Sequence, residues 1–210
     1  MKVLVTLIAL ISFTSFSQDA KAEKILNALS AKLKANPDFY IEFNAHLKNS
    51  ASGLNESNTG KGWVKGDKFH SSYGENTRIS NGVKSWTILK EEKSVYVTDA
   101  DDEDEDAINP KKLMTVWEKG FTSKYDKETK LGTETVQVIN LYPKNASKVE
   151  YHTITLYINA SNDLKKVIMK TKDGTVMTYS VTKFEPSKSI PDSKFVFDKS
   201  KYPGYKIIED

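Results

Sequence analysis

The 210-residue chain contains no cysteine. This absence excludes a thiol nucleophile, a zinc site built on thiolates and a redox motif. It also excludes a lipid anchor attached to a cysteine behind a leader sequence. A domain of this size buries enough apolar surface to fold without disulfides, so their absence is compatible with secretion. The sequence therefore predicts a protein that moves freely rather than one tethered to a membrane.

The chain also lacks a large excess of positive or negative charge. The chain has 31 basic and 28 acidic residues, which gives a net charge of +3. Nucleic-acid-binding proteins gather basic residues on one face, whereas the lysines here are scattered and alternate with other residue types. We expect no nucleic acid as a partner.

Catalytic and metal-binding motifs are lacking as well. The histidines His46, His70 and His152 lie far apart, and there is no nucleophile elbow or glycine-rich phosphate loop. The acidic run Asp99–Asp106 has no glycine of the kind that a calcium loop needs for its turn, so it is interpreted as a solvated loop. We predict no catalytic residue, no metal and no cofactor. An enzyme assembled from distant residues stays the weakest of three hypotheses.

Long hydrophobic runs are limited to one near the start. Val3–Ile11 follows the basic Met1-Lys2 and precedes the mostly small and polar Ser12–Ser17. A bilayer-spanning helix needs about 20 apolar residues, so this order is typical of a signal peptide over residues 1–17, cleaved near Ser17-Gln18. The alternative is a buried N-terminal helix or strand. Residues 18–210 are predicted to form one domain.

Two helices are expected in this domain. Apolar residues at Ala22, Ile25, Leu26, Leu29 and Leu33 follow a 3.6-residue period, and Asn36-Pro37 ends that helix. Asn109-Pro110 begins a second helix, which Gly120 ends. We interpret the first as an amphipathic helix packed on a sheet.

Most of the remaining chain alternates with a period of two, as in Phe39–Lys48. Ser50–Gly62 is rich in Ser, Asn and Gly and is interpreted as a loop or hairpin turn, while Asn81-Gly82 and Asp173-Gly174 predict hairpin turns. Further strands are expected at 62–65, 68–73, 77–80, 83–89, 93–98, 135–142, 150–158, 164–171, 175–184 and 206–208. The predicted fold is mainly β (α+β), an antiparallel sheet of about eleven strands that curls and is covered by helices.

A set of local strings, in this order, resembles the LolA family of periplasmic outer-membrane lipoprotein carriers. The strings are the first helix, Phe39–Lys48, Gly62–Phe69, Ile79–Trp86 with its Asn-Gly turn, Asn109–Met114, Leu141–Lys144, Phe195–Phe197 and Pro203–Tyr205. The resemblance covers nearly all of residues 18–210. It implies an open, strongly curved eleven-stranded half-barrel closed by short helices, with an acyl-binding cavity.

One position departs from the family pattern. After the Lys-Phe of the third strand the family typically carries Arg and then Trp, and that Arg helps to hold the closed form. Here Lys68-Phe69 is followed by His70 and Ser71. His70 is therefore a possible gating residue, and the alternative is a histidine that faces solvent.

The resemblance and the bulky apolar positions together predict the site. Methionine and aromatic side chains suit a cavity that must also release its ligand. The expected lining is Phe43, Phe69, Trp86, Leu113, Met114, Trp117, Ile154, Leu156, Met169 and Met177. For each of them, ordinary core packing is the alternative.

The predicted function is a periplasmic, monomeric, non-enzymatic carrier that shields the acyl chains of lipoproteins and delivers them towards the outer membrane. The resemblance implies an inner-membrane lipoprotein-release complex and an outer-membrane acceptor as partners. The alternative is a lipid-binding, glycolipid-binding or envelope-sensing protein of the same fold, because both functions need the same cavity.

Overall fold

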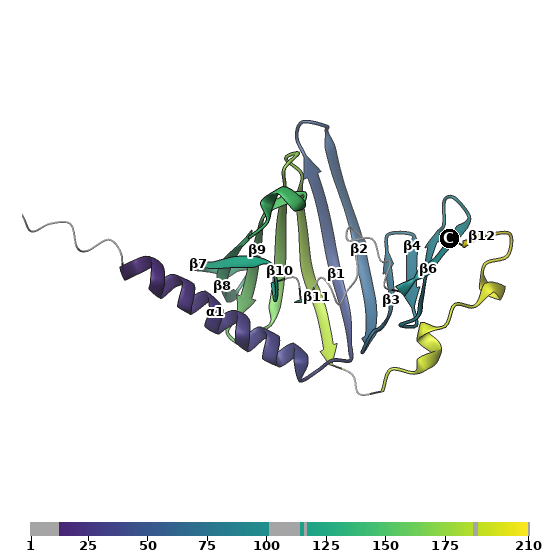
Figure 1. Cartoon of the computed structure of the whole chain (residues 1–210), viewed down its shortest axis with the longest axis horizontal. Helices are drawn as coiled ribbons and strands as arrows, with labels where there is room; N and C mark the ends of the chain where they lie inside the picture. The colour runs from purple at the N-terminus through teal and green to yellow at the C-terminus, as the bar shows by residue number, and fades with distance from the viewer. Residues whose placement is uncertain (1–12, 101–113, 116, 187–188, 210) are drawn as a thin grey trace, which may run out of the picture.

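The computed structural model describes residues 13–100, 114–115, 117–186 and 189–209, with side chains described from Asp19 onwards. Figure 1 shows one large open sheet with a single long helix lying across the half that contains β7–β11. This arrangement confirms the predicted mainly β, open antiparallel fold.

Helix α1 spans Phe13–Lys34. Its stripe of Ala22, Leu26, Leu29 and Leu33 is buried, as the 3.6-residue period predicted. The helix ends before Pro37, where Asn36 Nδ2 donates a hydrogen bond to the Lys32 carbonyl at 2.9 Å. The predicted leader falls largely on residues 1–12, outside the described residues, and stays a prediction.

The sheet has twelve strands in the order β12-β6-β5-β4-β3-β2-β1-β11-β10-β9-β8-β7. Neighbouring strands are antiparallel except for β12 and β6, which run parallel. The strands are β1 Phe39–Asn49, β2 Leu54–Lys65, β3 Lys68–Tyr73, β4 Asn76–Ser80, β5 Lys84–Leu89, β6 Ser94–Asp99, β7 Phe121–Leu131, β8 Glu134–Pro143, β9 Tyr151–Asn159, β10 Leu164–Thr171, β11 Val176–Pro186 and β12 Lys206–Glu209. The 3₁₀ helices among the described residues are η2 Ala146–Lys148, η3 Asp192–Phe195 and η4 Lys199–Lys201.

The prediction of a loop or hairpin turn over Ser50–Gly62 holds for the turn at 50–53, but it was wrong beyond it, because β2 begins at Leu54 and pairs with β1 along its length. Gly60 serves packing rather than turning. A Cβ atom at Gly60 would lie 2.1 Å from Cζ of Phe43, so only glycine leaves room for that ring. The absence of a side chain at Gly60 is therefore a requirement of the core.

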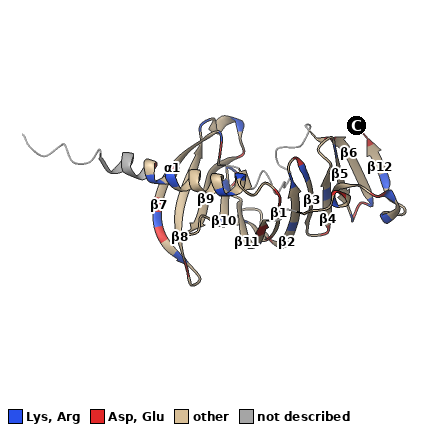
Figure 2. Cartoon of the chain, turned by 90° about the horizontal axis from the view of Figure 1, so that it is seen from below, with Lys and Arg blue, Asp and Glu red and all other residues tan. Residues whose placement is uncertain are grey.

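Strand β7 was not predicted. It is an edge strand whose side chains are exposed or half-buried. Figure 2 shows charges of both signs along it, which is typical of edges that resist further pairing. Half of the predicted helix 109–120 lies outside the described residues, and residues 117–120 are turn and bend, so the prediction that this helix extends to Gly120 was wrong. Met114 and Thr115 are helical, and Gly120 has a φ of +82°. The cover of the sheet is therefore one 22-residue helix, not a set of short ones, in the part of the chain that the structure describes.

The sheet buries opposite faces in its two halves. Phe69 pairs with Ser80 and His70 pairs with Ile79, and successive residues of a strand point to opposite faces. Phe69 belongs to a large cluster under α1, whereas Ile79 belongs to a smaller cluster on the other face. The C-terminal segment, yellow in Figure 1, runs along the half of the sheet that contains β3–β6.

These clusters are named the main core and the second core. The main core consists of Ala22, Leu26, Leu29, Leu33, Phe39, Ile41, Phe43, Ala45, Val64, Phe69, Met114, Trp117, Ile139, Leu141, Ile154, Leu156, Ile158, Leu164, Val167 and Tyr179. The second core consists of Ile79, Ile88 and Val95, with Trp86, Phe197, Tyr202, Tyr205 and Ile207 packed against them.

Candidate functional site

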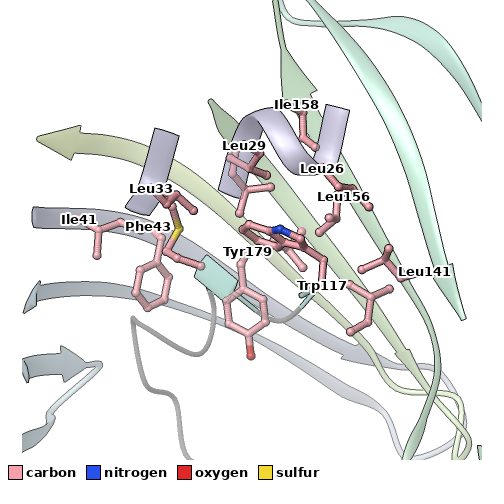
Figure 3. Packing of buried hydrophobic residues seen from close by; sticks show 14 of the residues in the cluster. Leu26, Leu29, Leu33, Ile41, Phe43, Trp117, Leu141, Leu156, Ile158 and Tyr179 are labelled. Atoms are coloured by element: carbon pink, nitrogen blue, oxygen red, sulfur yellow. The ribbon is translucent and has the colours of Figure 1, made fainter. Parts of the chain in front are cut away.

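The main core lies between α1 and the strands β1 and β8–β11. Figure 3 shows Leu26, Leu29 and Leu33 of α1 above the sheet, with Trp117 and Tyr179 between them and the strands. Ile154 and Leu156 are fully buried, and Phe43 is 2% exposed. In this conformation apolar side chains of the protein themselves occupy the space under the helix.

Most of the residues predicted to line a cavity come together here. Phe43, Phe69, Met114, Trp117, Ile154 and Leu156 are members of the main core, and Met169 and Met177 pack against its margin. Trp86 lies apart, because it packs in the second core on the opposite face. Leu113 lies outside the described residues. A lipid contact for any of them stays a prediction.

Sequence reasoning missed two contributors to this site. The leucines of α1 were assigned to packing and not to the site, although they form its roof. Tyr179 was also missed, although it lies in the predicted strand 175–184 and alternation could have placed it on the inner face. The signal for both was periodicity, which identifies a buried face but not what that face encloses.

The interior of the site is apolar, and the Arg78 guanidinium carbon lies 5.9 Å from the ring centroid of Phe69, a member of the main core. In the described part of the chain, the buried polar residues are the uncharged Asn49, Ser71, Ser80, Ser85, Ser94 and Asn159. Burial raises the pKa of Tyr179 to about 12, so its hydroxyl stays protonated at physiological pH. An apolar enclosure accepts hydrocarbon and penalises charged ligand groups.

Polar contacts join α1 to the rest of the protein at its edges. Trp117 Nε1 donates to Ser30 Oγ at 2.9 Å. Lys32 Nζ donates to the Ser161 carbonyl at 2.8 Å and forms an ion pair with Asp163 at 2.5 Å.

Two further contacts involve cations of α1. Lys34 pairs with Glu118 at 3.1 Å, and the Lys21 ammonium lies 3.7 Å from the centroid of the Tyr125 ring. Ion pairs as exposed as these each stabilise a protein by about 0–1 kcal/mol. The helix is therefore held mainly by its apolar stripe.

His70 does not contact α1. Its Nδ1 lies 2.7 Å from the Lys194 carbonyl oxygen, and its ring meets Trp63 edge-on at 5.5 Å. A carbonyl only accepts, so Nδ1 carries the proton of this bond. Burial lowers the pKa of His70 below the ordinary 6.5, despite the opposing effect of this hydrogen bond. The residue thus binds the C-terminal segment on the face opposite the helix, and a gating role for it stays a prediction.

The described residues contain no cluster of three or more His, Asp or Glu side chains that could hold a metal ion. Residues 101–106 of the acidic run lie outside the described ranges. No helix within those ranges is long and apolar enough to span a bilayer.

The fold and the site define a class: an open antiparallel half-barrel with one helix closing an apolar interior. The family model for the outer membrane lipoprotein carrier protein LolA matches residues 14–175. The chain therefore belongs to the LolA family, which confirms the resemblance seen in the sequence. Comparison with curated proteins gives no match.

Solved structures share this fold at low identity. An uncharacterised conserved protein from Thermus thermophilus is 10% identical with a TM-score of 0.56, covering 90% of this chain and 99% of that one. The Mycobacterium tuberculosis lipoprotein LppX is 10% identical with a TM-score of 0.51, covering 82% and 100%. LprF from Mycobacterium bovis is 11% identical with a TM-score of 0.50, covering 80% and 96%.

Proposed function

We propose that the protein binds the acyl chains of lipoproteins in the main core, beneath α1, and carries them through the periplasm towards the outer membrane. The observation that carries this proposal is an apolar layer beneath α1, a helix held by its apolar stripe and by polar contacts such as Trp117–Ser30 and Lys32–Asp163. Membership of the LolA family supports it.

The energetics of hydrocarbon transfer explain why such a layer is needed. Each methylene removed from water contributes about 0.8 kcal/mol, so an acylated protein does not cross an aqueous compartment with its chains exposed. Chains that enter beneath α1 replace contacts between the helix and the sheet with contacts to lipid. This exchange recovers most of the burial that opening the helix loses.

Movement of α1 is physically reasonable because a helix satisfies its own backbone hydrogen bonds. Displacing it breaks side-chain packing and a few polar contacts, but no ladder of the sheet. Met169 and Met177 at the margin adapt to a new neighbour at low cost because their side chains are flexible. The protein acts by binding alone, as a monomer, and exchanges cargo with a release complex in the inner membrane and an acceptor in the outer membrane.

The test is mass spectrometry of material that co-purifies with the protein from the periplasm under mild conditions. We expect acylated protein fragments. Detection of free lipid or glycolipid, without acylated protein, would be consistent with the proposed binding site but would overturn the lipoprotein-carrier function. A protein that neither co-purifies with lipid nor takes up a fluorescent fatty-acid probe would overturn both.

A further inference from the structure

A groove on the other side of the sheet has the features of a second binding site. It is lined by Tyr40, Trp63, Ile190, Pro191 and Lys194, together with Ser189 and the end of β11, and has a volume of about 670 Å³. Pockets of roughly 300–1,000 Å³ hold small molecules. Tyr40 and Trp63 are paired neighbours on β1 and β2, and they face away from Phe39 and Val64 of the main core. The groove therefore lies mainly on the face opposite the proposed lipoprotein site, and Phe184, which also lines it, packs against the main core.

The floor of the groove is aromatic and fixed. The rings of Tyr40 and Trp63 lie 4.9 Å apart. The Tyr40 hydroxyl donates to Glu42 at 2.6 Å, and His70 meets the Trp63 ring edge-on. Burial, then the hydrogen bond to Glu42, raises the pKa of Tyr40 to about 12. This floor is an uncharged surface that favours an apolar or flat group.

The wall of the groove is held in place by polar contacts to β2 and β3. Lys65 Nζ donates to the Ile190 carbonyl at 3.1 Å, and both Lys65 and Lys68 pair with Asp192 at 3.0 Å. Phe195, next to Lys194, is fully buried. The segment that carries Lys194 is thus anchored at both ends, which preforms the groove.

Charge at the groove favours an anion. The Lys194 ammonium lies 4.2 Å from the centroid of the Trp63 ring, and no carboxylate of the described residues pairs with it. Glu185 also lines the groove, but Lys183 pairs with it at 3.0 Å. A second lysine, Lys61, lies 6.0 Å from the same ring. The cation beside the aromatic floor is therefore available to a ligand.

We propose that this groove binds a small anionic amphiphile. Its apolar part lies on Tyr40 and Trp63 and against Ile190 and Pro191, and its carboxylate or phosphate pairs with Lys194. Two sources share this chemistry, a free fatty acid and the headgroup end of a phospholipid. This binding does not rest on the proposed carrier function, because Tyr40 and Trp63 face away from the main core. Phe184, at the end of the groove, packs against that core.

Three indole N–H groups make the test specific to each face. The chain has three tryptophans: Trp63 reports on the groove, Trp117 on the main core and Trp86 on the second core. Their signals in a nitrogen–proton NMR spectrum are assigned with single Trp→Phe variants. The probes are decanoate, decyl phosphate and the neutral decyl maltoside, each titrated below its micelle concentration. The full chain is used throughout.

Saturable movement of the Trp63 signal with decanoate or decyl phosphate, and weaker movement with decyl maltoside, would support the groove. A lower dissociation constant for decanoate would identify a free fatty acid as the ligand. A lower dissociation constant for decyl phosphate would identify the headgroup end of a phospholipid. Lys194→Gln should weaken anion binding about tenfold or more, because a charge-assisted hydrogen bond is lost. Lys199→Gln, an exposed lysine of the same segment, is the matched control and should leave binding unchanged.

Two results would overturn the proposal. One is a Trp63 signal that stays still while the Trp117 signal moves, which would leave the proposed carrier site standing alone. The other is a pair of observations on binding at Trp63. Decyl maltoside would bind with the same affinity as the anionic probes, and Lys194→Gln would weaken binding no more than Lys199→Gln does. Movement of Trp63 without movement of Trp117 would retain the groove and count against the carrier site.

Discussion

The main core and the second core lie on opposite faces of one sheet, and they are closed in different ways. The second core is covered by the C-terminal segment, which ends in β12 and is hydrogen-bonded to β6 as a further strand. Its aromatic rings stack in a row, with Trp86 on Phe197 at 5.7 Å and Phe197 on Tyr202 at 5.5 Å. The main core is covered by α1, which shares no backbone ladder with the sheet.

This difference shows which cover can move. Lifting the C-terminal segment breaks backbone hydrogen bonds as well as packing, so it costs more than packing alone. Lifting α1 leaves every backbone hydrogen bond of helix and sheet intact. The comparison therefore favours a structural role for the second core and supports the proposal that ligand exchange takes place at the main core.

The largest effect is expected where the main core is truncated. Phe43→Ala should lower the free energy of unfolding by about 3–5 kcal/mol, because a fully buried ring is replaced by a cavity. Urea denaturation measures this change. The control is Val83→Ala at a side chain that is 71% exposed, where little change is expected. A loss below about 1 kcal/mol for Phe43→Ala would show that the main core repacks freely.

Gly60→Ala tests the contact beneath that ring. The added methyl group displaces Phe43 and should cost about 1–3 kcal/mol, as overpacking does. In the Phe43→Ala background the same substitution should be nearly neutral, since the obstructing ring is gone. A double-mutant cycle measures the coupling. Strictly additive effects would contradict the packing role assigned to this glycine.

Phe197→Ala probes the second core and should have a smaller effect. Loss of the ring stack should cost about 1 kcal/mol beyond the lost burial, and it should move the indole signal of Trp86 while leaving that of Trp117 in place. Val196→Ala, at a neighbouring side chain that is 60% exposed, is the matched control. Equal disturbance of both indole signals would mean that the two cores are not separate.

The smallest effect is expected from pH at His70. Burial lowers its pKa in the folded protein below 6.5, so the unfolded chain binds a proton more readily. The free energy of unfolding should therefore decrease as the pH falls from 7 through 6.5 towards the folded pKa. His70→Gln should flatten this part of the profile, measured by urea denaturation at several pH values. An unchanged slope would remove His70 from the contact with the C-terminal segment.

Periodicity in the sequence predicted most of the fold because each half-buried element repeats its pattern. The α1 stripe and β3 are examples, and β3 has the predicted bounds. Sequence patterns missed strand β7 because even its better covered face is only half-buried and includes polar residues such as Ser123 and Thr129, so apolar and polar residues do not alternate along it. They missed Leu54–Gly62 because the stretch is rich in Ser, Asn and Gly, and the reason for Gly60 is Phe43, a partner that only the fold brings near.

The candidate site was harder to predict for a different reason. The sequence pattern predicts that both Trp86 and Phe69 are buried. The sheet reverses its buried face between β3 and β4, so the two residues lie in different cores. A pattern along one strand shows that a face is buried, but not whether α1 or the C-terminal segment covers it. The groove at Lys194 depends on residues far apart in the sequence, such as Trp63 and Lys194. Nothing in the local sequence links them.

The central claim, that acyl chains enter by displacement of α1, is tested by tying the helix down. Because the chain has no cysteine, the pair Lys32→Cys and Asp163→Cys can be joined by a short bis-maleimide with a reducible disulfide in its spacer. As a matched control, Lys65→Cys and Asp192→Cys are joined in the same way, which ties the C-terminal segment instead. All variants also carry Lys194→Gln, so that the proposed groove contributes little to uptake. Uptake of a fluorescent fatty-acid probe should then be lost when α1 is tied, return on reduction of the spacer, and persist in the control. Unchanged uptake with α1 tied would contradict the account.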